Sequence, residues 1–259
     1  MKIFLSALEN AQSSKAEGGK SKYIAELLVK DGVKMRWNLC SYYYIKDRLP
    51  LAEFIRDNSE EMLIDSGAHS FQFGKKVDFL EYTKQYAEFI KKFDRPNVIG
   101  YFEMDVDNVI GYDKVLELRK ILEQVTDKII PVWHRNRGIE DFKKMCQQYA
   151  GKIVAITGFA NKEIRDEQYI MFLKYAKKYN CKVHCLGMTR KKILDKVPFD
   201  YVDSSSWVQD SIFGRIKDKG KVTRDFSKTS RGVIFKENYL AGKKMQEHYY
   251  QKWRKVCKD

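Results

Sequence analysis

The alternation of short apolar runs with longer amphipathic segments constrains the fold of this chain more than any other feature. Between the apolar runs, apolar residues recur at helical spacing, for example over residues 79–93, 112–125, 139–150 and 167–179. Strands that alternate with helices of this length pair in parallel. Eight runs have the length of strands: residues 2–6, 35–41, 62–65, 98–105, 129–134, 153–157, 182–187 and 201–203.

Eight such units predict an α/β fold, a closed (β/α)8 TIM barrel, rather than an open doubly wound sheet. The length of 259 residues agrees with this, since such barrels typically have about 250 residues. We expect the barrel to occupy residues 1–210. Residues 211–259 are expected to form a basic C-terminal extension, with a helix over 237–258 that packs on the outside of the barrel.

The positive charge of the chain is concentrated near its end. The total is +14, and the segment from Arg215 to Asp259 carries 14 basic and 5 acidic residues, a net charge of +9. A concentrated positive field favours a polyanionic partner, because each neutralised phosphate releases counterions. A solubilising lysine-rich surface would explain the charge equally well. Six aromatic residues are interleaved with these charges and are candidates for stacking on bases: Phe226, Phe235, Tyr239, Tyr249, Tyr250 and Trp253. Several of them are expected instead to anchor the last helix to the barrel.

Several other classes of protein are disfavoured. No run of about 18 apolar residues is present, so we expect no membrane span, and the first residues do not resemble a secretory signal. Five cysteines without a repeated CxxC pair indicate neither a disulfide framework nor a zinc ribbon, and we expect a reduced cytoplasmic location. The segment CKVHC (181–185) superficially suggests a metal site. On a strand, however, Cys181 and Cys185 share one face and His184 points to the other, which favours packing.

Polar residues stand where the predicted strands end. Active sites of (β/α)8 barrels lie at the C-terminal ends of the strands, so these residues are the candidates for a site. They are Asp65-Ser66-Gly67, Glu103 to Asp107, Trp133 to Asn136, Thr157-Gly158-Phe159, Leu186-Gly187-Met188 and Asp203 to Trp207.

Three of these residues are aspartates on different strands: Asp65, Asp105 and Asp203. Singly, Asp65 could cap a helix and Asp203 could cap a turn. Asp105 could be a solvated loop acid, and Asp107 is expected to be one. Together, three carboxylates in one pocket would repel each other and lose solvation, which a fold tolerates mainly where chemistry needs it. Two carboxylates with separate roles suffice for displacement at a sugar C1′, one as the nucleophile and one as the proton carrier.

The glycines and the histidine at these strand ends allow two interpretations each. Gly158 and Gly187 could leave room for a planar ligand against the backbone, and a tight turn explains Gly187 as well. His134 could be a core histidine, although its position after Pro131-Val132-Trp133 favours a side chain that faces the ligand.

The motifs at these positions resemble the tRNA-guanine transglycosylases, which exchange guanine for a 7-deazaguanine base. DSGAHSFQ (65–72) resembles their DSGG-type signature, and FEMDV (102–106) resembles the segment with their guanine-recognising aspartate. PVWH (131–134) falls where they have a strand that ends in glutamine. AITGFA (155–160), HCLGMTRKKILDKV (184–197) and FDYVDSSSW (199–207) resemble three further family segments in the same order.

The resemblance implies a role for each candidate residue. Asp203 would attack C1′ and form a covalent glycosyl intermediate, and Asp65 would carry the proton of the base N9. Asp105 would accept the N–H donors of the Watson–Crick edge of guanine. The remaining predicted base contacts come from Ser66, Gly67, His69, His134, Thr157, Gly158, Phe159, Leu186 and Gly187.

The chain also departs from the family. It lacks the C-terminal CxCxxC zinc cluster, Ala68 replaces the second glycine of the signature, and His134 replaces the glutamine. The resemblance therefore implies no metal and no other cofactor, and it is strongest to the short zinc-less enzymes that act on DNA. We expect DNA as the favoured partner, tRNA as the alternative, and a free 7-deazaguanine base as the second substrate. A non-catalytic base-binding barrel and a glycoside hydrolase remain rival interpretations.

Overall fold

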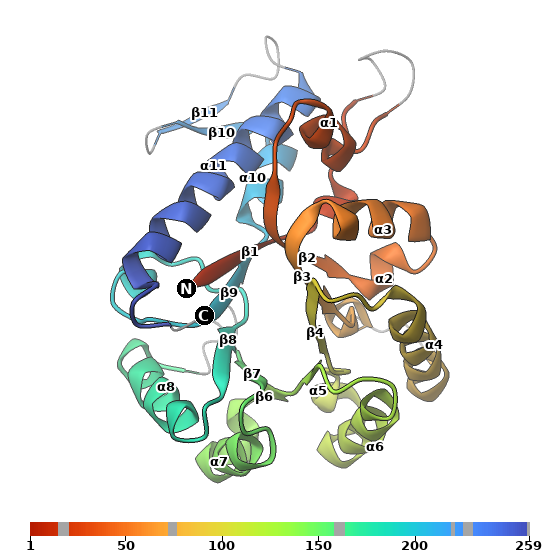
Figure 1. Cartoon of the computed structure of the whole chain (residues 1–259), viewed down its shortest axis with the longest axis vertical. Coiled ribbons are helices and arrows are strands. Elements are labelled where there is room, and N and C mark those ends of the chain that lie inside the picture. Colours follow the sequence, from red (N-terminus) through yellow and green to blue (C-terminus); the bar gives the residue numbers. More distant parts are fainter. Residues whose placement is uncertain (15–20, 72–76, 158–163, 219–220, 225–229, 258–259) are drawn as a thin grey trace.

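The structure is a computed structural model of the chain and describes residues 1–14, 21–71, 77–157, 164–218, 221–224 and 230–257. Its centre is a nine-stranded sheet in the order β5-β4-β3-β2-β1-β9-β8-β7-β6, and all pairs in it are parallel. The sheet curls into a nearly closed barrel (Figure 1). The strands are β1 (Lys2–Ser6), β2 (Met35–Ser41), β3 (Ser59–Asp65), β4 (Val98–Phe102), β5 (Ile129–Ile130), β6 (Val132–Trp133), β7 (Ile153–Ile156), β8 (Lys182–Cys185) and β9 (Tyr201–Ser204).

Pro131 separates β5 from β6, so the expectation of one unbroken strand over 129–134 is wrong. Proline has no backbone N–H to donate to a ladder. The N–H of the next residue, Val132, donates instead to Glu103 Oε1 at 2.6 Å, while the Pro131 carbonyl accepts from the Ala155 N–H at 2.8 Å. β5 and β6 are the two ends of the sheet order, and only Pro131 separates them in the chain. The two edges of the barrel-like sheet therefore meet at Pro131.

Helices surround the sheet, as the alternating pattern predicted (Figure 1). The helix expected at 79–93 has these bounds, and Asp78 caps it by accepting from the Leu80 and Glu81 N–H groups. Among the described residues the α-helices are α1 (Ile24–Lys30), α2 (Tyr42–Ile45), α3 (Leu49–Asp57), α4 (Phe79–Phe93), α5 (Asp107–Ile110), α6 (Tyr112–Glu123), α7 (Gly138–Gln148), α8 (Tyr169–Lys178), α9 (Lys191–Leu194), α10 (Ser206–Ile212) and α11 (Arg231–Trp253). A hairpin of β10 (Arg215–Asp218) and β11 (Lys221–Arg224) lies between α10 and α11.

Side chains alternate between the two faces of each strand, which gives an inner and an outer core. The residues of β8 illustrate this alternation: Val183 and Cys185 pack in the outer core, and the His184 ring lies inside against Phe4 and Phe102. The sequence prediction for these faces is therefore confirmed. The inner cluster consists of Phe4, Trp37, Leu39, Leu63, Phe102, Ile130, Val132, Ala155 and Tyr201.

The last helix, α11, is an integral part of this core. It begins at Arg231 rather than at the expected residue 237, because the Ser230 hydroxyl caps it by accepting from the Val233 N–H. Gln246 is completely buried, and its amide donates to the carbonyls of Ile3 and Trp37 at 2.8 and 2.9 Å. These bonds connect β1 and β2, so α11 covers the side of the sheet where the chain begins (Figure 1).

The aromatic residues of this segment are mostly not available as a stacking surface. Phe235, Tyr239 and Tyr249 are buried, and the Tyr239 hydroxyl donates to Asn38 Oδ1 at 2.9 Å. They anchor the helix, whereas Phe226 lies outside the described residues. In the part of the chain that the structure describes, none of the helices combines the length and the apolar character that a bilayer crossing requires.

Candidate active site

Asp203 lies near the end of β9 and faces the interior of the barrel-like sheet. It follows Tyr201 at a spacing of two on β9, so both side chains lie on the inner face. Its Oδ1 accepts from the Gly187 N–H at 2.8 Å and pairs with His184 Nε2 at 3.0 Å, and its Oδ2 accepts from the Ser6 hydroxyl at 3.3 Å. The side chain is 15% exposed. Asp203 is thus an anchored carboxylate that is not completely buried.

Asp65 ends β3 and faces the same interior. Its Oδ2 accepts from the Gly67 N–H at 2.9 Å and from the Ser41 hydroxyl at 3.3 Å. Burial raises the pKa of Asp65 to about 6, and although the Gly67 hydrogen bond lowers it, the negative charges of Asp105 and Asp203 add to the increase. The three predicted aspartates therefore lie close enough to influence each other electrostatically, and Asp65 can hold or release a proton near neutral pH.

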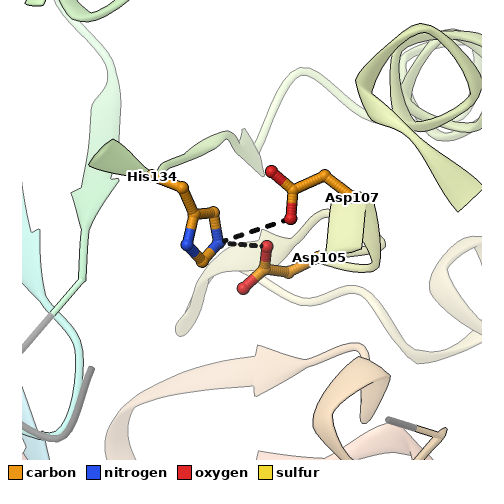
Figure 2. Close-up of side chains that lie close together, drawn as sticks. All are labelled: Asp105, Asp107 and His134. Carbon is orange, nitrogen blue, oxygen red and sulfur yellow. Dashed lines mark hydrogen bonds and ion pairs between the residues drawn. The ribbon is translucent and has the colours of Figure 1, made fainter. Parts of the chain in front are cut away.

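Asp105 follows β4 and is not simply a solvated loop acid, because its carboxylate contacts His134. Its Oδ1 lies 2.6 Å from His134 Nε2, and Asp107 Oδ1 lies 4.0 Å from the same nitrogen (Figure 2). The Asp105 side chain is 23% exposed, whereas that of His134 is 6% exposed. The structure thus brings His134 to the carboxylate of Asp105, which leaves Asp105 as the more accessible of the two.

Asp107 is not the solvated loop acid that the sequence suggested. Its side chain is 2% exposed, and its Oδ2 accepts from Arg137 Nη2 and Nε at 3.1 and 3.2 Å. The guanidinium of Arg137 also lies 3.9 Å from the centre of the Tyr112 ring. Because Arg137 is 30 residues away in the sequence, this ion pair was not visible in the local pattern.

Asp105, Asp107 and His134 also have the residue types of a metal site. One ligand atom from each lies within 4.8 Å of the others (Figure 2). However, Arg137 already neutralises Asp107, and the short Asp105–His134 contact is a hydrogen bond between two of the would-be ligands. We therefore interpret the cluster as a hydrogen-bonded charge network that fixes the orientation of Asp105.

Two of the predicted glycines are required by the backbone. Gly67 has a φ of +80°, and a Cβ there would lie 2.4 Å from the Cβ of Tyr43. Gly187 has a φ of +61°, but nothing lies within 4 Å of the place where its Cβ would be. The positive φ of the turn therefore explains Gly187, and the open space beside it is also compatible with a ligand. Both glycines use the resulting N–H to hold a catalytic candidate, Asp65 or Asp203.

The other predicted contacts are less exposed or are not described. Ser66 and Thr157 are buried, and the Ser66 hydroxyl has no hydrogen-bond partner among the described residues. Leu186 is partly buried against the inner cluster. His69 belongs to a short 3-10 helix, Ala68–Phe71, but its side chain is outside the described part, as are Gly158 and Phe159.

Sequence reasoning missed three residues that contact the candidate catalytic pair: Ser6, Ser41 and His184. The serines are the last residues of β1 and β2, so the rule that selected Asp65 by its strand-end position would have selected them too. His184 was assigned to packing because its inner-face position does not by itself reveal Asp203 on the neighbouring strand.

Comparison with protein-family models and with curated proteins gives no match for this chain.

Proposed function

We propose that this protein is a transglycosylase that replaces guanine in nucleic acid with a 7-deazaguanine-type base. The observation that carries the proposal is a pair of inward-facing carboxylates with different surroundings. Asp65 has a pKa raised to about 6, and Asp203 is held by an N–H, a hydroxyl and an imidazole. A displacement at C1′ needs one proton carrier and one nucleophile.

The fold that we propose for this chemistry is a (β/α)8 barrel. Counting β5 and β6 as one strand interrupted at Pro131 gives eight strands. The support for this count is that the two segments pair with opposite neighbours, β4 and β7, and are separated by one residue. In a (β/α)8 barrel, the carboxyl ends of the strands form the active site, and Asp65 and Asp203 lie at such ends.

The first half-reaction would expel guanine. An oxygen of Asp203 forms a bond to C1′ while the C1′–N9 bond breaks, and the electron pair of that bond goes to N9. Protonated Asp65 gives its proton to the departing base. The product is free guanine and a glycosyl ester on Asp203.

The second half-reaction would install the new base. N9 of the incoming base forms the bond to C1′, the ester bond breaks, and its electron pair returns to the Asp203 carboxylate. Asp65, now ionised, takes the proton from N9. The cycle consumes no metal, redox equivalent or water, and it returns both aspartates to their starting states.

Asp105 is the residue that we propose recognises the base. A carboxylate accepts hydrogen bonds from N1–H and N2–H2 of guanine, whereas adenine would leave it unpaired at a substantial cost. The contact with His134 holds Asp105 Oδ1 in place. His134 would therefore position Asp105, whereas the sequence predicted that His134 itself contacts the base.

DNA is the favoured polymer in this proposal, with tRNA as the alternative. The support is the net charge of +9 between Arg215 and Asp259, together with the absence of a CxCxxC cluster from the sequence. A base in a duplex would have to be flipped out or presented on a single strand, at a cost of a few kcal/mol.

The proposal is tested by trapping the intermediate. The protein is incubated with guanine-containing DNA or with tRNA, denatured, and examined for a covalent adduct, and exchange of labelled guanine is measured in parallel. Wild type should form the adduct and Asp203→Ala should not. An adduct with Asp203→Ala would refute the assignment of the nucleophile, and failure of wild type on both polymers would favour a non-catalytic base-binding protein.

A further inference from the structure

His184 is a polar residue in an apolar interior. It is completely buried, and its ring lies 5.0 Å from Phe102, 6.4 Å from Phe4 and 6.5 Å from Tyr201, measured between ring centres. Burying an imidazole among apolar rings is unfavourable unless its polar atoms are paired. The partner of Nε2 is Asp203, while Nδ1 has no hydrogen-bond partner among the described residues.

The hydrogen bonds of Asp203 are distributed unevenly between its two oxygens. Oδ1 interacts with two nitrogens, His184 Nε2 at 3.0 Å and the Gly187 N–H at 2.8 Å. Oδ2 accepts only the longer bond from the Ser6 hydroxyl, at 3.3 Å, within the described part of the chain. Since the partner of Nε2 is a carboxylate oxygen, the tautomer that satisfies this contact carries its proton on Nε2.

We propose that His184 is a positioning residue that, together with the Gly187 N–H, holds Asp203 Oδ1 and leaves Oδ2 as the nucleophilic atom. This inference rests on the proposed transglycosylase function. It assigns a role to a residue that does not contact the nucleotide, and it distinguishes the two oxygens of the catalytic carboxylate.

The same two donors would serve both half-reactions. When Oδ2 bonds to C1′, Oδ1 becomes the carbonyl oxygen of the ester and still accepts from His184 and Gly187. When the incoming base displaces the ester, negative charge returns to the carboxylate, and donors already in place stabilise it without rearrangement. If Oδ1 were the nucleophile, its two donors would instead oppose the attack, because they stabilise the lone pairs that must form the bond.

The histidine also restricts rotation of the Asp203 side chain. The imidazole is planar and is enclosed by the rings of Phe4, Phe102 and Tyr201, so its Nε2 has a fixed position. A fixed donor on one oxygen determines where the other oxygen points, and such alignment with C1′ contributes strongly to the rate of a displacement.

The test compares three substitutions with different donor geometry. His184→Gln keeps an N–H near the position of Nε2, His184→Asn places its N–H near Nδ1, and His184→Phe keeps a ring without a donor. We expect His184→Phe and His184→Asn to lower the rate of adduct formation at saturating nucleic acid by about 100-fold. The KM for nucleic acid should stay within about threefold, and His184→Gln should recover the rate to within about tenfold of wild type.

Val183→Ala is the matched control for packing, since Val183 precedes His184 on β8 but its side chain packs in the outer core, away from Asp203. It should leave the rate of adduct formation unchanged even if it lowers the thermal midpoint. Wild-type rates in folded His184→Phe would overturn the positioning role, and equal losses in His184→Gln and His184→Phe would overturn the donor role. If wild type itself forms no adduct and exchanges no guanine, the proposed function is refuted, and the role of His184 that rests on it is refuted as well.

Discussion

Asp65 and Asp203 have opposite proposed roles, although the groups that surround them are of the same kinds. Each lies at the inner face of a strand end, each accepts an N–H from a glycine with positive φ, and each accepts a serine hydroxyl from a neighbouring strand. On Asp65 both donors bind Oδ2. On Asp203 the donors reach both oxygens and include a buried histidine. The two carboxylates thus differ in how their donors are distributed, and burial raises the pKa of Asp65 to about 6.

Replacing each aspartate in turn should give the largest difference in adduct formation between Asp65 and Asp203. Asp203→Asn should abolish adduct formation, a loss of roughly 10,000-fold or more, because the bond to C1′ cannot form. Asp65→Asn should slow the first half-reaction by about 100- to 10,000-fold, the usual contribution of a general acid, while the adduct still accumulates over a long incubation. Single-turnover measurements on both polymers check this, with circular dichroism as the control for folding.

An equal and complete loss of the adduct in both variants would contradict this division of roles. A glycosyl adduct that maps to residue 65 rather than 203 after proteolysis would reverse the assignment.

The pH dependence should separate the two half-reactions. Expulsion of guanine needs Asp65 protonated, so kcat/KM for the nucleic acid should fall about tenfold for each pH unit above about 6. Capture of the incoming base needs Asp65 ionised, so its rate on preformed intermediate should rise with pH up to a similar value. Rapid-quench measurements of each half-reaction from roughly pH 4.5 to roughly pH 8.5, a range that spans both protonation states of Asp65, check both slopes.

Asp65→Asn serves as the control, because its residual rates should lose both pH dependences. Parallel slopes for the two half-reactions in wild type would show that Asp65 is not the shared proton carrier.

Stability should respond least, and with a characteristic sign. A carboxyl group whose pKa is raised in the folded state makes folding less favourable at a pH where it must ionise. Asp65→Asn should therefore increase the free energy of unfolding at about pH 8, by roughly 1–3 kcal/mol. This gain should shrink as pH falls through about 6 and vanish below about pH 4, where Asp65 is protonated in both states. Urea unfolding at several pH values checks it.

Asp203→Asn is the matched comparison for stability. The amide would place an NH2 group toward at least one of the donors that now hold the carboxylate, so we expect no gain at about pH 8. A gain equal to that of Asp65→Asn would mean that the two carboxylates are equally destabilised by burial.

The sequence predicted the strands well because their patterns are local. The strands at 2–6 and 35–41 and the helix at 79–93 have the expected bounds, since apolar spacing and the Asp78 cap define them. The break at Pro131 was foreseeable from the missing N–H, and the early start of α11 from Ser230. The positions of Asp65 and Asp203 followed from the rule that polar strand ends of parallel sheets gather on one side.

The contacts between distant residues could not be predicted in this way. The burial of Asp107 depends on Arg137, and the role of His184 depends on the register that pairs it with Tyr201, two residues before Asp203. A register between strands is a property of the folded sheet, so the sequence limited the partners of His184 without identifying Asp203.

Gln246 has a consequence for how the chain reaches its folded state. Its amide joins carbonyls that lie 243 and 209 residues earlier in the sequence. During synthesis on the ribosome, β1 and β2 emerge before α11, and the side of these strands that α11 covers stays exposed until α11 has been translated. Contacts of such long sequence separation slow folding, and apolar strands that wait for a late partner can pair with other chains in the meantime. We therefore expect β1 and β2 to be among the last strands to complete their packing.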